Sequence, residues 1–177
     1  MSVTEAVGHA QPAAQTAGTA APQSAAGSSA SSSHLALMVG EDRYLVDLAE
    51  AGEIVPVPPS SIQQVPLTRD WFLGVVNVCG ALFTVVDLAR FMGGSFTPLS
   101  KESRLLTMSP ALAFNATLVV TRMLGLRNSA TMTPLDEKPA LDKPWLTELY
   151  RDGEGQIWRR LSLSKLVAAS AFLMVGR

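Results

Sequence analysis

Hydrophobic and polar residues alternate along most of this chain in short runs, each ended by a turn signal. Alternation with a period of two residues is typical of half-buried β-strands. Helices are predicted over residues 87–92, stopped by Gly93, and over 165–174, where Ser162 offers an N-cap. One further helical turn is predicted over 49–52. The segments predicted as strands are residues 35–39, 44–48, 53–57, 74–78, 81–86, 104–108, 145–150 and 156–161, with one or two more within 112–124.

Turn residues join these strands into hairpins. Residues 40–42 (Gly-Glu-Asp) and 152–155 (Asp-Gly-Glu-Gly) are predicted hairpin turns. Prolines at the end of 53–57 keep that strand near a sheet edge, and the proline-rich stretch 131–144 is a predicted surface loop. Many short strands with close turns favour an all-β barrel or sandwich with a few short helices. Because a helix follows a strand in each half, we expect two similar small lobes.

The first 33 residues differ from the rest of the chain. They are almost entirely Ala, Ser, Gly, Gln, Thr and Pro, with Glu5 as the one charged side chain. Such a segment buries too little apolar surface to offset its ordering entropy, so we expect a disordered tail over 1–33 and one folded domain over 34–177. No secretory signal and no membrane-spanning run is present in the sequence, which favours the cytoplasm.

Composition excludes several classes of function. The 14 Lys and Arg residues against 15 Asp and Glu give a net charge of −1, so nothing draws the chain to nucleic acid or to a membrane surface. A lone cysteine, Cys79, excludes a disulfide framework and a multi-cysteine metal site. With only His9 and His34 besides, we expect no metal and no cofactor.

Few residues suggest catalysis. Asp87 is a candidate acid, but an N-cap for the following helix is the favoured interpretation. Cys79 is a candidate nucleophile, yet it has no evident base, so a small strand residue is favoured. Glu53 is either a partner contact or a solvated charge. The tryptophans predicted to pack in the core are Trp71, Trp145 and Trp158. These residues favour binding over catalysis, and we expect no enzyme.

Three stretches resemble the family of CheW-like domains. Residues 39–48 (VGEDRYLVDL) with Glu53-Ile54 resemble the first hairpin of that family. Residues 71–80 (WFLGVVNVCG) resemble its "hydrophobic-x-G-V-x-N-L-R-G" stretch, and 85–88 (VVDL) its "P-V-V-D-L". The similarity continues more weakly over 118–128 and 145–163. Within it, LGLRN at 124–128 is most similar to the branch of the family that serves twitching motility by type IV pili.

The resemblance implies a fold of two SH3-like five-stranded β-barrel lobes joined by short helices, with a C-terminal helix. It also implies a non-enzymatic adaptor for chemotaxis-type signalling. Such an adaptor couples the cytoplasmic tips of methyl-accepting chemoreceptors to the regulatory domain of a CheA-type histidine kinase. The expected location is the cytoplasm, at receptor arrays, without direct insertion into the membrane.

The resemblance places receptor contact in a groove between the lobes. The candidate residues for it are Ala51, Glu53, Ile54, Val78, Cys79 and Val86. The sequence departs from the family at Cys79, where the family has arginine, and at Thr121, where it often has aspartate. Losing the arginine removes a fixed charge and a bidentate donor. Two alternatives therefore stay open: a scaffold that fills arrays by binding only the kinase, and a redox sensor based on Cys79.

Overall fold

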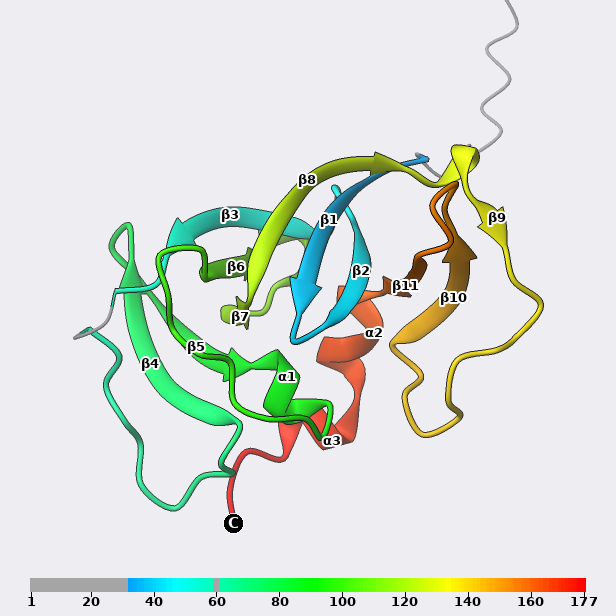
Figure 1. Ribbon diagram of the computed structural model, residues 1–177. Helices are drawn as coiled ribbons and strands as arrows, with labels where there is room; N and C mark the ends of the chain where they lie inside the picture. Colours follow the sequence, from blue (N-terminus) through cyan, green and yellow to red (C-terminus); the bar gives the residue numbers. More distant parts are fainter. Residues whose placement is uncertain (1–31, 59–60) are drawn as a thin grey trace, which may run out of the picture.

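The computed structural model describes residues 32–58 and 61–177 (Figure 1). The predicted tail over 1–33 therefore lies outside the described residues, apart from its last two positions. Ser33 already pairs with Asn128, so the first strand begins at that residue.

One sheet collects strands from both ends of the domain. Its order is β8-β1-β2-β11-β10-β9, and β2 pairs with β11 in parallel. Its strands are β1 (Ser33–Val39), β2 (Asp42–Asp47), β8 (Arg122–Asn128), β9 (Thr133–Pro134), β10 (Leu146–Arg151) and β11 (Ile157–Leu161). The parallel pair joins the N-terminal hairpin to the C-terminal one, which no local pattern in the sequence reveals.

The second sheet is formed by the middle of the chain. Its order is β3-β6-β7-β5-β4, with β5 and β7 parallel. Its strands are β3 (Ala51–Pro56), β4 (Phe72–Val78), β5 (Ala81–Asp87), β6 (Arg104–Met108) and β7 (Ala116–Val120). The mostly β architecture in two lobes is confirmed, and β3 is an edge strand. The lobe formed by the first sheet has six strands rather than five, because Thr133 and Pro134 of the predicted loop 131–144 pair with β10 as β9.

The helices are short and capped as the sequence indicates. They are α1 (Leu88–Phe91), α2 (Leu163–Ala168), α3 (Ser170–Leu173) and the 3₁₀ turns η1 (Pro110–Leu112) and η2 (Ser129–Thr131). Asp87 caps α1 and Ser162 caps α2, each through its side chain. Within the described part of the chain, every helix is too short to cross a membrane.

Two predicted helical segments are wrong. The helix expected over 165–174 breaks at Ala169, whose backbone is extended. Leu166 and Phe172 are both buried. Residues six positions apart lie on different faces of a continuous helix, so the break at Ala169 is what lets Phe172 point into the core as well. The expected turn over 49–52 is a non-helical turn leading into β3. There the Glu50 carboxylate accepts hydrogen bonds from Leu163 and Ser164, the first backbone N–H groups of α2.

The largest core lies between the two sheets and the helices. Alternate residues of β7 face it, including Leu118, while Val119 faces a second, smaller core inside the five-stranded sheet. All of β7 is therefore buried. A third small core, around Trp158, lies on the face of the six-stranded sheet opposite the main core. Trp71 and Trp145 lie in the main core, so the prediction that the three tryptophans pack inside is confirmed.

Candidate functional site

The two outer strands of the five-stranded sheet, β3 and β4, approach each other at the turn between β4 and β5. Cys79 and Gly80 form this two-residue turn, and both have positive φ, 47° and 84°. That is the backbone of a type I′ turn, the form whose twist suits a hairpin. The Gly80 N–H donates to the Asn77 side-chain oxygen at 3.0 Å. Cys79 Sγ lies 3.7 Å from Glu53 Oε2 on β3, so the thiol of the turn contacts the carboxylate of the other outer strand.

A β-bulge turns Glu53 outward on β3. The pairing of β3 with β6 shifts between Ala51 and Ile54. At Gly52, a Cβ would come within 2.4 Å of Thr107 Oγ1, and that hydroxyl accepts the Glu53 N–H at 2.6 Å. The bulge leaves two consecutive side chains, Glu53 and Ile54, both exposed, where a regular strand would turn one of them inward.

The six residues expected in the receptor groove occupy different environments. Glu53, Ile54 and Cys79 are exposed. Ala51 is partly buried against the main core. Val78 and Val86 are only 8% and 2% exposed and pack in the small and main cores, respectively. The exposed members of the set thus form one corner of the five-stranded sheet.

The exposed corner includes one large apolar side chain that the sequence analysis did not single out. Leu82 is 61% exposed and pairs with Asn77 across the β4–β5 hairpin. Strand alternation gives no signal for it, because Leu82 lies three positions from Val85 and four from Val86, and both valines are buried, on opposite faces of the sheet. We refer to Glu53, Ile54, Cys79 and Leu82 as the hairpin corner.

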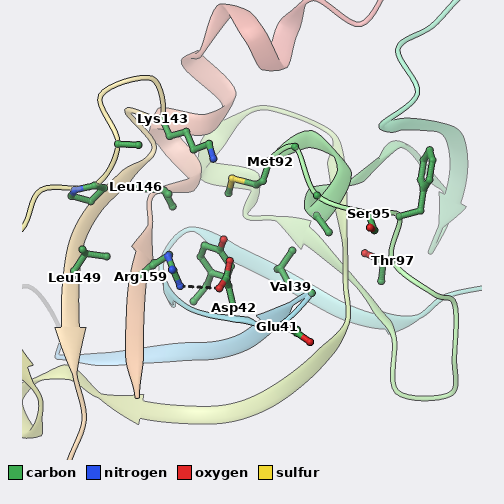
Figure 2. Close-up of a pocket in the computed structure, with 18 of the residues that line it drawn as sticks. Val39, Glu41, Asp42, Met92, Ser95, Thr97, Lys143, Leu146, Leu149 and Arg159 are labelled. Atoms are coloured by element: carbon green, nitrogen blue, oxygen red, sulfur yellow. Dashed lines mark ion pairs between the residues drawn. The ribbon is translucent and has the colours of Figure 1, made fainter. Parts of the chain in front are cut away.

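A larger groove opens elsewhere, between the lobes. It has a volume of about 840 Å³ and is lined by the β1–β2 turn, the loop after α1, the loop before β10, and β10 and β11 (Figure 2). None of the six predicted residues lines it. Arg159 and Asp42 form an ion pair of 3.2 Å across one side, and Met92, Lys143 and Leu146 face the same space. The groove therefore presents mixed apolar and charged walls.

Asp87 holds the loop that forms one wall of this groove. Its carboxylate accepts hydrogen bonds from Arg90 N at 3.2 Å, Thr97 N at 2.7 Å and Thr97 Oγ1 at 2.8 Å. Asp87 is 1% exposed. These hydrogen bonds confirm that Asp87 is the N-cap of α1. They also show a second role, because the same carboxylate anchors Thr97 in the loop after the helix.

The Tyr44 hydroxyl group is expected to give the protein an alkaline stability limit. Burial, followed by the charge of Asp42, raises the pKa of Tyr44 from 10.0 to about 12, and Arg159 opposes this shift. The folded state thus holds the proton more tightly than the unfolded state. This difference in pKa stabilises the folded state. The stabilisation is complete below pH 10, the ordinary pKa of tyrosine, and is lost as the pH rises toward the pKa of Tyr44 in the folded protein.

We therefore expect the unfolding free energy to fall by about 2 kcal/mol between roughly pH 10 and pH 12 through this one group. Urea titrations across that range measure it. Tyr44→Phe lacks the ionisable group and should lose less stability over the same range. Parallel pH profiles for the two proteins would contradict the assignment.

The described residues contain little catalytic chemistry. His34 is buried in the six-stranded sheet, where Nδ1 contacts the Ser32 carbonyl and Nε2 lies 3.2 Å from Asp47. The exposed Cys79 thiol contacts the Glu53 carboxylate rather than an imidazole. Across residues 32–58 and 61–177, no group of three or more His, Cys, Asp or Glu side chains is placed to hold a metal ion.

Comparison with known proteins gives three findings. The profile of the family described as CheW-like domain matches residues 33–171. The chain is 28% identical over 147 residues to Protein PilI of Pseudomonas aeruginosa strain PAO1, covering 81% of this chain and 80% of PilI. The crystal structure of the scaffolding protein TtCheW from Thermoanaerobacter tengcongensis superposes with a TM-score of 0.64 at 20% identity, covering 78% of this chain and 94% of that one. The last likeness concerns the fold.

Proposed function

Because this chain belongs to the family of CheW-like domains, we propose that it couples chemoreceptor tips to a CheA-type histidine kinase. It is a non-enzymatic adaptor or scaffold of a chemosensory system and a homologue of PilI. The proposed pathway is the one that controls type IV pili and twitching motility. The proposed location is the cytoplasmic face of receptor arrays.

The hairpin corner is the observation that carries the receptor half of this proposal. Ile54 and Leu82 are 42% and 61% exposed, and they flank a carboxylate at the meeting point of two sheet edges. Exposed apolar side chains grouped around a few polar atoms are typical of surfaces that bind an amphipathic helix. A receptor tip is a helical hairpin, and the apolar side chains on one face of its helices would pack against Ile54 and Leu82.

Cys79 changes the chemistry of this corner without removing it. Where the family's arginine would neutralise a carboxylate, the thiol is a weak donor at 3.7 Å from Glu53. Glu53 therefore keeps its negative charge available. We infer that the receptor segment supplies a positive or hydrogen-bond-donating residue to Glu53 in place of the missing arginine.

Adding a charge at the hairpin corner should weaken receptor binding. Leu82→Glu places a second carboxylate beside the apolar contact, and we expect at least a tenfold loss in affinity, about 1.4 kcal/mol. The measurement is calorimetric titration of the full chain with the receptor's cytoplasmic hairpin and, separately, with the kinase's regulatory domain. Leu141→Glu is the matched control, because Leu141 is 97% exposed and lies in the loop before β10, away from the corner.

The outcomes separate the alternatives. Binding to both partners, with only receptor binding lost in Leu82→Glu, would support the adaptor. Binding to the kinase alone would favour a scaffold that fills arrays. Binding to neither, together with rapid alkylation of Cys79 in the folded protein, would favour the redox sensor. Equal losses in Leu82→Glu and Leu141→Glu would remove the hairpin corner from the proposal.

A further inference from the structure

A second surface, on the Trp158 side of the six-stranded sheet, carries a group of arginines. A cavity of about 560 Å³ opens there between β8 and the β10–β11 turn. Arg43, Arg122 and Arg127 line it, together with Leu124 and Trp158. The proposed receptor contact lies on the other sheet, so this surface is separate from it.

A β-bulge in β8 creates the group. Residues 122 and 127 differ by five positions, so a regular strand would turn their side chains to opposite faces. In the structure Leu124 has no partner on β1, and the pairing shifts at this point, with Gly125 at φ 82°. The extra residue reverses the alternation, so that Arg122 and Arg127 pair with Met38 and His34 on one face of β1. Bulges of this kind commonly re-aim side chains toward functional surfaces.

Among the residues that the structure describes, the arginines of this surface lack the ion pairs that three other arginines of the fold form. Arg90, Arg159 and Arg160 each form an ion pair with a carboxylate. In the described part of the chain, no carboxylate lies within ion-pair distance of the three in the cavity.

Their contacts are neutral instead. Arg43 donates to the Gln156 side chain at 2.7 Å, Arg122 contacts Met38 Sδ at 3.3 Å, and Arg127 lies 6.0 Å from the ring centre of Trp158. Arg122 and Arg127 are also exposed.

The acidic residues of the cavity cancel only part of this charge. The Asp152 carboxylate accepts hydrogen bonds from Glu154 N, Gln156 N and Trp158 Nε1, each at 2.9 Å. The Trp158 bond is the main reason that the pKa of Asp152 is lowered. Asp152 holds the turn and also carries a negative charge near Arg43, so two carboxylates, Asp152 and Glu154, stand against three guanidinium groups in the lining. In a chain of net charge −1, this is a local excess of positive charge.

We propose that this surface, defined by Arg43, Arg122 and Arg127, binds an acidic, extended segment of a protein partner. Guanidinium groups pair bidentately with carboxylates. Arg43 and Arg122 lie on the two strands that flank Met38 of β1, and Arg127 pairs with His34, four positions away along β1, so the three arginines are spread over the sheet. That arrangement suits successive carboxylates along a chain better than one compact anion. Asp152 and Glu154 also line the cavity, and their charges disfavour a compact, multiply charged group there.

The test uses the full chain and a fluorescein-labelled peptide of alternating Glu and Thr, followed by fluorescence anisotropy. We expect saturable binding that weakens as salt is added, because exposed ion pairs are screened. The double variant Arg122→Glu/Arg127→Glu should bind at least about tenfold more weakly. Lys101→Glu/Lys138→Glu has the same net charge but changes exposed lysines outside the cavity, and it should bind within about twofold of the natural chain.

Several results would overturn the proposal. These are no saturable binding at low salt, an equal loss in the lysine control, or binding of anionic vesicles or RNA but not of the peptide. If the glutamate variant does not fold, Arg122→Gln/Arg127→Gln removes the charges without adding repulsion and must still weaken binding. Leu82→Glu, at the hairpin corner, should leave peptide binding unchanged, so failure here is distinguishable from failure of the receptor proposal.

Discussion

Gly74→Ala is expected to destabilise the protein by about 4 kcal/mol, enough to unfold many single domains. Gly74 has φ of 137°, a backbone conformation that side chains other than hydrogen rarely adopt. A Cβ at this position would lie 2.0 Å from the Gln63 carbonyl oxygen and 2.7 Å from its carbon. Backbone atoms cannot move aside as a flexible side chain can.

The clash would also break a bridge between β4 and the segment before it. Gln63 N–H donates to the Val75 carbonyl at 2.8 Å, and Val75 N–H donates to the Gln63 carbonyl at 2.9 Å. This bridge holds residues 61–65 against β4, where Ile62 covers the small core of the five-stranded sheet. Relieving the clash means giving up both bonds and that contact.

Urea unfolding monitored by tryptophan fluorescence measures the effect. Gly153→Ala is the matched control, because Gly153 has no atom within 4 Å of an added Cβ and its φ is not positive. The control should change stability by less than about 1 kcal/mol. A Gly74→Ala variant as stable as Gly153→Ala would show that residues 61–65 are free to move away from β4.

Asp87→Ala is expected to cost about 3 kcal/mol. Removing a side-chain N-cap costs about 1 kcal/mol, and each buried donor left without a partner costs about 1–3 kcal/mol. Here the unpaired donors are the backbone N–H and the hydroxyl of Thr97, which is itself 7% exposed. Asp87→Asn keeps one acceptor oxygen and should lose less.

A double-mutant cycle with Thr97→Ala isolates the pair. The coupling energy from urea unfolding should be about 1–2 kcal/mol, because the two residues share two hydrogen bonds. Hydrogen exchange should also show faster opening of residues 93–97 in Asp87→Ala, since that loop loses its anchor. Additive effects of the two substitutions would mean that Thr97 is held by the rest of the loop.

The elements that the sequence predicted well depend on near neighbours. Strand alternation located the hairpins β1–β2, β4–β5 and β10–β11, and the capping residues Asp87 and Ser162 marked the starts of helices. The local prediction was wrong where a distant contact decided the outcome. Glu50 lies in a non-helical turn whose carboxylate caps α2 more than a hundred residues later, and Ala169 breaks a helix so that Phe172 can reach Trp71.

The candidate surfaces show the same division. Glu53 and Cys79 were identified from motif residues, and the structure brings their side chains together. Val78 and Val86 belong to the same motifs but are buried on opposite faces of the sheet, Val78 in its small core and Val86 in the main core. Whether the hairpin corner binds a receptor stays a prediction.

The β-rich class, the hairpins, the caps and the family follow from the amino-acid sequence, because each depends on residue types within a few positions of one another. The parallel pairs β2–β11 and β5–β7, the groove between the lobes, and the bulges at Gly52 and Leu124 arise from contacts between distant segments of the folded chain. A bulge is fixed by how two strands fit across a curved sheet, and it reverses the alternation on which any pattern is based. For that reason Arg122 and Arg127 share a face in the folded protein although their spacing predicts opposite ones.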